Sequence, residues 1–461
     1  MPSAFPDELK IAKVIPLFKK GSKTDLTNYR PISILPSLSK VIEKLIYVRL
    51  NNFFDKHGIL TQHQYGFRKK HSTEFAILDL QEKIASALEN KQSAISIFLD
   101  LSKAFDCINH VILLKKLQYY GIRGLAFDLM VSYIKNRQQY VVVDNVSSAP
   151  INIHCGVPQG SILGPLLFLI YINDIVNTSD LIYFILFADD TNLFISDANT
   201  DNLYNIINVE MTKISLWFKV NKLKININKC CFIHFSNLNS NAKNIYLEGA
   251  PLCQVQNTKF LGVYIDQNLN WSAHIQCISN KLVKIVATVS KIKHLLPKST
   301  LMQLYYTLVY PIITYGILAW GHADKVHLNK LSVLQNRFLY KISNSSWVTR
   351  SNSVYINLNC LKLSELVIAK CCIFVFKLKR NLLPGICNKY LVNLNKTIAM
   401  QLRSKEKLTH GYARIKCSHN SIKFLAPRVW NSLPKSLHEI TTIAKFKKEI
   451  FNYLKKEYLS N

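Results

Sequence analysis

The chain has 461 residues, and its 58 Lys and Arg residues against 28 Asp and Glu residues give a formal net charge of +30. This length exceeds what one hydrophobic core supports, so we expect two or more subdomains. The basic excess indicates a polyanionic partner, because Lys and Arg displace counterions from a phosphate backbone. The alternative is a basic protein without such a partner.

The same composition argues against several classes of protein. The 11 cysteines show no CxxC pair and no regular Cys/His spacing, which argues against a zinc site and favours reduced thiols. Residues 1–6 lack the charged-then-apolar pattern of a signal peptide, so we expect an intracellular protein, with nucleus or cytoplasm left open. The uncharged stretches 145–173 and 307–323 contain prolines, which indicates buried core and no membrane partner.

The predicted elements begin with residues 9–40, whose prolines and basic residues predict mostly irregular structure. Apolar spacing then predicts helices, while apolar runs and turn residues predict strands. The expected helices cover 38–56, 72–88, 110–120, 125–135, 163–173 and 201–221, with a helical pattern from 271 onward. The expected strands are 94–100, a ribbon of 138–144 with 151–154, a hairpin over 181–196, a strand over 231–235 and a second hairpin around 260–266. The Asn-rich stretch 236–244 is the least ordered candidate.

Two acidic motifs follow apolar, strand-like runs. Asp100 comes after the run 94–99, and Asp189 and Asp190 lie where the strands of the hairpin 181–196 meet. Carboxylate oxygens suit Mg²⁺, and two such ions can clamp the attacking and leaving oxygens of a phosphoryl displacement. We therefore expect these three residues to hold two Mg²⁺ ions, with Mn²⁺ as an alternative because it also takes oxygen ligands. The competing interpretation is a pair of solvated turns.

With the glycine-rich segment 156–164 between them, these motifs give the chain a family resemblance. It resembles the reverse transcriptases of non-LTR retrotransposons, the LINE-type elements of the Jockey and CR1 kind. Residues 13–35 look like the segment ahead of the fingers, and Gln64-Tyr65-Gly66-Phe67-Arg68 looks like a fingers motif. Motifs A to E are matched in order by segments 100–106, 156–165, 187–190, 223–229 and 260–266. The stretches 310–316 and 426–434 look like the tails of such reading frames.

The resemblance implies an α+β fold, a right-hand polymerase with fingers, a palm built on an antiparallel sheet and a helical thumb, followed by a mainly helical C-terminal region. We expect the pre-fingers and fingers segment over 1–92 and the palm with motifs A–E over 93–270. The helical thumb is expected over 271–345 and a basic C-terminal region over 346–461. Since the chain starts almost at the pre-fingers segment, we expect it to lack the N-terminal endonuclease of these elements.

The resemblance also implies roles for single residues. Phe105 would exclude a 2′-hydroxyl, Gln159 and Gly160 would touch the nucleotide, and the forked Arg68 would meet its triphosphate. Lys229 would protonate pyrophosphate. The nucleic-acid contacts would come from Lys20, Arg30, Lys69, Leu261 and Gly262. Each role has a plainer alternative. Phe105 could be a core aromatic residue, and Gln159 and Gly160 could belong to a structural turn. Lys229 could be part of an Asn-Lys turn, and Arg68 or Arg30 could be a surface side chain without a ligand.

The implied function is an RNA-directed DNA polymerase that extends a DNA primer with dNTPs on an RNA template. The alternative is a catalytically inactive, nucleic-acid-binding remnant of such an element. Phe105 and the Phe-Ala-Asp-Asp form of motif C argue against an RNA-directed RNA polymerase, and the C-terminal stretches argue against group II intron maturases and telomerase. Which RNA is copied and the oligomeric state are left open.

Overall fold

The computed structural model of the chain describes residues 4–236, 243–344, 350–390, 408, 413–456 and 458. At its centre lies a sheet with strands in the order β14 (Cys253–Gln254), β11 (Cys231–Phe235), β3 (Ser93–Leu99), β9 (Asp190–Asp197) and β8 (Tyr183–Phe187). Neighbouring strands are antiparallel, except that β14 runs parallel to β11. The predicted strand over 94–100, the hairpin over 181–196 and the strand over 231–235 are therefore confirmed.

Helices cover both faces of this sheet. Ala94 and Phe98 of β3 belong to the hydrophobic cluster that contains α2 (Thr73–Glu89), whereas Ile95 and Ile97 belong to the cluster of α5 (Gly164–Ile172) and α6 (Thr200–Val220). Successive side chains of a strand point to opposite faces, which accounts for this division. Because β3 has a strand on either side and helices on both faces, all of its residues are buried.

The helix α2 begins where the sequence predicts. Ser72 is its N-cap, and the Ser72 hydroxyl accepts a hydrogen bond of 3.4 Å from the Phe75 amide. Such a cap satisfies one of the amides that a first helical turn leaves unpaired.

A second sheet contradicts the prediction of mostly irregular structure over residues 9–40. β1 (Ile11–Phe18) and β2 (Tyr29–Ile34) form an antiparallel pair in which Pro16 faces Pro31. β1 also pairs in parallel with β5 (Arg137–Val143), but only along 11–14, ahead of Pro16. The prediction failed because proline lacks only the amide donor and is tolerated where no ladder hydrogen bond needs that amide. Pro31 lies on the outer strand β2, and Pro16 lies on β1 beyond the residues that pair with β5.

The rest of this sheet confirms the predicted ribbon: β6 (Val146–Ser147) and β7 (Ile151–Ile153) both pair with β5. The predicted helix over 38–56 is α1 (Ser37–Lys56). Further elements complete the N-terminal part: α3 (His110–Tyr119), α4 (Leu125–Ile134), β4 (Leu101–Ser102) with β10 (Lys224–Ile225), β12 (Tyr246–Leu247) with β13 (Ala250–Pro251), and the predicted second hairpin, β15 (Asn257–Phe260) with β16 (Val263–Asp266). Residues 237–242 of the stretch expected to be least ordered lie outside the described residues.

From residue 272 onward the residues that the structure describes are mainly helical, as predicted. The helices are α7 (Ser272–Ile292), α8 (Lys298–Leu304), α9 (Tyr310–Thr314), α10 (Ile317–Trp320), α11 (Lys325–Ser343), α12 (Ser351–Asn357), α13 (Leu363–Lys379), α14 (Lys416–His419), α15 (Ile422–Asn431), α16 (Lys435–His438) and α17 (Ile443–Lys456). Among the described residues, none of the helices combines the length and the apolar character that crossing a membrane requires.

The C-terminal helices and α2 share one hydrophobic cluster that extends from Tyr65 to Tyr458. At its edge lies Asp79 of α2, which is fully buried. Its carboxylate accepts hydrogen bonds from the hydroxyls of Tyr65 (2.6 Å) and Tyr183 (2.9 Å) and forms an ion pair with Lys389. The C-terminal region is thereby bonded to the back of the central sheet.

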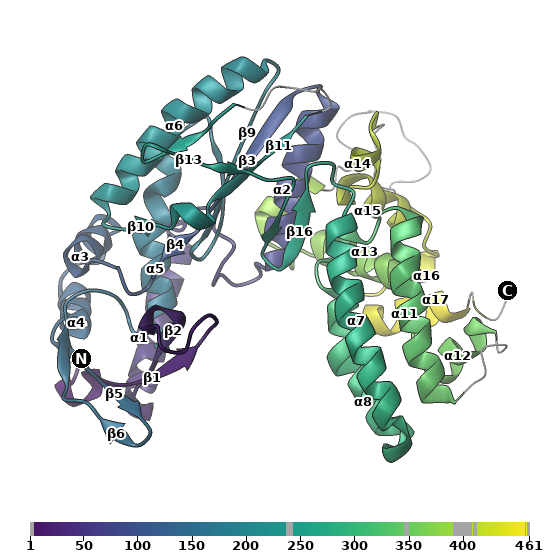
Figure 1. Cartoon of the computed structure of the whole chain (residues 1–461), viewed down its shortest axis with the longest axis horizontal. Helices are drawn as coiled ribbons and strands as arrows, with labels where there is room; N and C mark the ends of the chain where they lie inside the picture. Colours follow the sequence, from purple (N-terminus) through teal and green to yellow (C-terminus); the bar gives the residue numbers. More distant parts are fainter. Residues whose placement is uncertain are drawn as a thin grey trace.

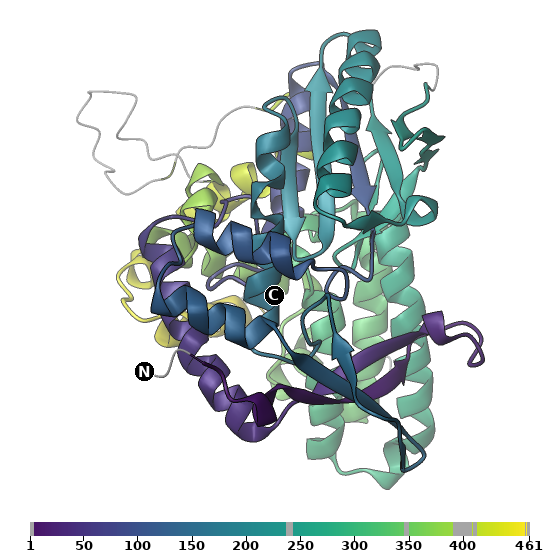
Figure 2. The ribbon, with the colours of Figure 1, turned by 90° about the vertical axis from the view of Figure 1, so that its left-hand side faces the viewer.

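Figure 1 shows the resulting arrangement: the strands β1 and β2 lie on one side and the helices α7, α8 and α11 on the other, with the central sheet above and between them. In Figure 2 the purple N-terminal strands run below the central sheet and alongside β5.

Candidate active site

Asp100 lies at the end of β3, where the apolar strand runs out toward solvent. The Asp100 amide donates to Cys230 Sγ (3.4 Å), and the Asp100 carbonyl accepts from the Asn226 amide (2.8 Å). These contacts fix the backbone while the carboxylate stays 40% exposed, with Oδ2 3.1 Å from Lys229 Nζ. Lys229, the residue expected at the end of motif D, therefore forms an ion pair with Asp100 of motif A.

Asp189 and Asp190 lie at the tip of the β8–β9 hairpin. The last paired residues are Phe187 and Asp190, so Ala188 and Asp189 form a two-residue turn. Ala188 has a φ of 55°, the positive value that a tight hairpin turn requires. Since β9 pairs with β3 up to Leu99, this turn lies beside Asp100.

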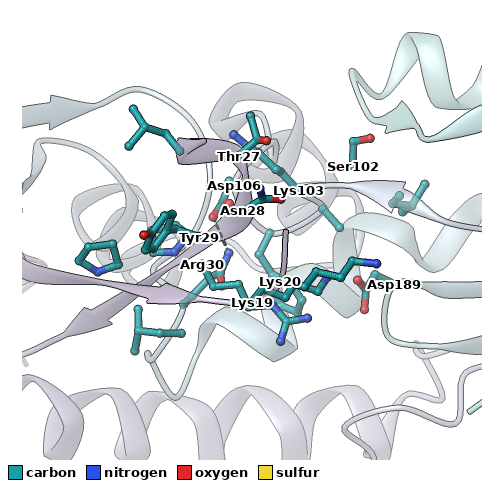
Figure 3. Close-up of a pocket in the computed structure, with 18 of the residues that line it drawn as sticks. Lys19, Lys20, Thr27, Asn28, Tyr29, Arg30, Ser102, Lys103, Asp106 and Asp189 are labelled. Carbon is teal, nitrogen blue, oxygen red and sulfur yellow. Dashed lines mark hydrogen bonds between the residues drawn. The ribbon is translucent and has the colours of Figure 1, made fainter. Parts of the chain in front are cut away.

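The three carboxylates line one cavity of about 1270 Å³ together with several cationic side chains. The cations come from the β1–β2 hairpin, from the turn after Asp100 and from the segment after β10: Lys19, Lys20, Lys23, Arg30, Lys103 and Lys229. In the view of Figure 3, Lys19 and Lys20 lie between Arg30 and Asp189. The cavity therefore has an acidic floor at the sheet edge and a basic wall.

The carboxylates repel one another electrostatically. Desolvation, with a further contribution from the charge of Asp100, raises the pKa of Asp189, while Arg30 and Lys19 oppose that rise. Desolvation and the charges of Asp189 and Asp100 raise the pKa of Asp190 to about 6. A cation among these groups would relieve the repulsion.

Phe105 and Gln159 also line the cavity. The Phe105 ring is stacked on Phe168 at 4.7 Å between centroids, which fixes its orientation. Gln159 Nε2 donates to Asp106 Oδ1 at 2.8 Å, so motifs A and B are bonded to each other. The Ser33 amide in turn donates to the Gln159 carbonyl at 2.8 Å, which attaches β2 to this loop.

The other predicted site residues lie outside the cavity lining. Gly160 packs on the backbone of Ser33: a Cβ at Gly160 would come within 2.2 Å of the Ser33 carbonyl oxygen. Arg68 is turned into its own loop, where Nη1 donates to the Thr61 carbonyl (2.6 Å), and Lys69 is exposed. Their contacts with substrate stay predictions.

Leu261 and Gly262, also outside the cavity lining, form the turn between β15 and β16. The Tyr315 hydroxyl donates to the Leu261 carbonyl at 2.7 Å, so a residue just after α9 holds this turn. The expected contact of this turn with nucleic acid remains a prediction.

The family described as reverse transcriptase (RNA-dependent DNA polymerase) matches residues 18–265, which is more than half of the chain and includes the three carboxylates and the cationic side chains of this cavity. The chain belongs to the reverse transcriptase family. The fold is accordingly the predicted right-hand polymerase with a helical C-terminal region, and the resemblance to LINE-type reverse transcriptases is confirmed by the relatives that follow.

The probable RNA-directed DNA polymerase from transposon BS of Drosophila melanogaster is 32% identical over 384 residues, covering 78% of this chain and 41% of the relative. The RNA-directed DNA polymerase from mobile element jockey of the same organism is 31% identical over 375 residues, covering 78% and 40%. The chain thus spans about two-fifths of the length of these relatives. Among solved structures, apo telomerase from Candida tropicalis is similar with a TM-score of 0.42 and 11% identity, over 78% of this chain and 63% of that one.

The residues that line the cavity fit a divalent metal, the kind of ion that the reverse transcriptase family generally uses. Within the ranges that the structure describes, no group of three Asp, Glu, His or Cys side chains is gathered as a metal site. The donors that line the cavity are nevertheless hard carboxylate oxygens, and Asp100 already has a cation, the Lys229 ammonium, at 3.1 Å.

Several residues of the site were not predicted from the sequence. Lys103 of motif A has a φ of 51° and lines the cavity, and Lys19 and Lys23 line it too, although none of the three has a predicted role. Gln64 belongs to the fingers motif and has no predicted role, yet its side chain reaches the turn that carries Asp189. The close spacing of Lys19, Lys20 and Lys23 in the sequence is the signal that indicates this basic wall.

Proposed function

We propose that this chain is an RNA-directed DNA polymerase that extends a primer 3′-hydroxyl with dNTPs on an RNA template by two-metal phosphoryl transfer. The observation that carries the proposal is the cavity itself, in which Asp100, Asp189 and Asp190 face a wall of Lys and Arg side chains. Carboxylates suit divalent cations, and the basic wall suits the phosphates of a nucleotide and a template.

In this proposal Asp100, Asp189 and Asp190 hold two Mg²⁺ ions, or Mn²⁺ in their place. When bound, such ions lower the pKa of the primer hydroxyl and neutralise the departing pyrophosphate. Lys20 and Arg30, on the β1–β2 hairpin, bind backbone phosphates. Lys229 donates a proton to pyrophosphate, because its ammonium group faces the cavity beside Asp100.

Selection of the sugar is assigned to Phe105. Because stacking on Phe168 fixes the ring against the cavity, a 2′-hydroxyl would collide with it, whereas a deoxyribose would not. The boundaries proposed for the parts of the hand are those expected from the sequence, with the palm over 93–270 and the thumb over 271–345.

The test is primer extension on an RNA template with dNTPs and either Mg²⁺ or Mn²⁺, comparing the parent with Asp189→Asn. Asp180→Asn is the matched control, because Asp180 is an exposed carboxylate just ahead of β8 and outside the cavity lining. We expect extension by the parent and the control, and a loss of at least about 100-fold for Asp189→Asn. A folded parent that binds the primed template but extends nothing would refute the proposal and favour an inactive nucleic-acid-binding remnant.

A further inference from the structure

The segment 63–66 runs beside the strand that leads into the Asp189 turn. The Leu186 amide donates to the His63 carbonyl at 2.9 Å, and the Tyr65 amide donates to the Leu186 carbonyl at 2.7 Å. Gln64 and Leu186 form a parallel bridge. This fingers segment therefore adds a short backbone pairing to the outer side of β8.

The side chain of Gln64 continues this contact beyond the end of β8. Its Oε1 accepts two hydrogen bonds, from the Gly66 amide (2.7 Å) and from the Ala188 amide (3.0 Å). Gln64 is only 2% exposed and Ala188 only 5%. A buried amide without a hydrogen-bond acceptor is unfavourable, and Gln64 Oε1 supplies the acceptor for the Ala188 amide of the turn.

Direct backbone contact accompanies these bonds. A Cβ added to Gly66 would lie 2.3 Å from the Ala188 nitrogen, so only glycine allows the segment to approach the turn this closely. Ala188 holds a positive φ of 55°, which is disfavoured for a residue with a side chain and persists only where the surroundings enforce it. The 63–66 segment provides those surroundings.

We propose that Gln64 is a positioning residue: through the Ala188 amide it holds the Ala188–Asp189 turn in the conformation that directs Asp189 into the cavity. The β3–β9 ladder reaches only Leu99 and Thr191, and the hairpin pairing ends at Phe187 and Asp190. The ladders therefore hold the strands, and Gln64 holds the turn between them. The consequence for metal binding and turnover rests on the proposed polymerase function.

The experiment compares Gln64→Met with Gln81→Met. Gln81 is a matched control because it is also buried, at 3% exposure, and donates to the Ala319 carbonyl on the far side of α2. Methionine keeps the length and volume of either side chain but removes the amide group. Both variants should lose similar thermal stability, whereas only Gln64→Met should alter the turn.

Two readouts separate positioning from a general structural role. Hydrogen exchange of the Ala188 amide in the metal-free protein is expected to accelerate at least about tenfold in Gln64→Met and to stay unchanged in Gln81→Met. In primer extension, Gln64→Met is expected to lower kcat or to raise the half-saturating Mg²⁺ concentration by about 10–100-fold, the usual cost of losing a group that orients a metal ligand. Affinity for the primed template should not change.

Gln64→Asn is the second variant, in case Gln64→Met does not fold. It keeps the amide group but is one methylene shorter, so its oxygen cannot reach the Ala188 amide, and we expect the same pattern. Unchanged exchange at Ala188 in a folded Gln64 variant would overturn the proposal, as would unchanged Mg²⁺ dependence and kcat. If the parent itself extends no primer, the polymerase function fails, while the exchange measurement still decides the role of Gln64.

Discussion

The ion pair between Asp79 and Lys389 offers a quantitative test of how the C-terminal region is attached. Lys389→Met would remove the cation and leave a fully buried carboxylate with only the hydroxyls of Tyr65 and Tyr183 as partners. Breaking a buried pair in this way costs about 3–5 kcal/mol. Because the Lys389 side chain is 36% exposed, solvent screens part of the interaction, and we expect a loss of about 2–3 kcal/mol.

The double variant Asp79→Asn/Lys389→Met should be more stable than Lys389→Met alone. It removes both charges, and the amide oxygen of the new side chain still accepts from the two tyrosines, so we expect a free energy of unfolding within about 1 kcal/mol of the parent. Asp79→Asn alone should fall between the two. This order of unfolding free energies would not arise if Asp79 and Lys389 stabilised the fold only through the surface area that they bury.

The assay is urea unfolding of the parent and the three variants at one pH and one salt concentration. Lys416→Met is the control, because its ion pair with Asp324 is largely exposed and should contribute less than about 1 kcal/mol. A change of less than about 0.5 kcal/mol in the free energy of unfolding of Lys389→Met would show that the pair does not stabilise this attachment, as would a double variant that is as unstable as Lys389→Met.

Three further outcomes are expected. Phe105→Val should lower discrimination against NTPs by about 10–100-fold in competitive primer extension, and unchanged discrimination would remove Phe105 from sugar selection. Gly160→Ala should destabilise the chain by about 2–4 kcal/mol in thermal unfolding, since its φ of 138° and a Cβ 2.2 Å from the Ser33 carbonyl oxygen both oppose a side chain; a variant as stable as the parent would contradict this. Burial lowers the pKa of His274 from 6.5 to about 4, so as the pH falls the unfolded chain takes up a proton first and stability is lost progressively between pH 6.5 and 4, by about 3 kcal/mol in full. His274→Leu should flatten this acid side of the stability profile, and parallel profiles for parent and variant would show that His274 does not contribute.

Local patterns predicted the central part of the fold well. The run 94–99, the hairpin around Asp189 and the strand 231–235 have apolar stretches bounded by turn residues, and the structure has strands at those places. The Ser72 cap likewise marks the start of α2. In these places the sequence signal and the tertiary environment agree, because each strand is covered on both faces.

The N-terminal strands show where local reading fails. Prolines such as Pro16 and Pro31 argue against strands on average, but here they face each other on a pairing that does not need both amides. Pro16 is tolerated because the pairing of β1 with β5 ends at Val14, and β5 comes more than 100 residues later in the chain.

The supporting contacts of the site were also beyond the reach of the sequence. Gln64 and Ala188 are 124 residues apart, and Asp79 and Lys389 are 310 residues apart. No periodicity or motif links such positions, since each bond forms only after several elements have packed. Residue types can indicate the carboxylates that hold a metal, but not the groups that hold those residues in place.

The shared cluster of α2 and the C-terminal helices also affects how the protein is made. The Ser418 hydroxyl donates to the Ala85 carbonyl across 333 residues, and Arg414 donates to the Leu88 carbonyl. Because synthesis proceeds at about 5–20 residues per second, the apolar face of α2 leaves the ribosome tens of seconds before these partners are synthesised. During that interval, chaperones would have to shield this face from aggregation, and a fragment limited to residues 18–265 would expose it permanently.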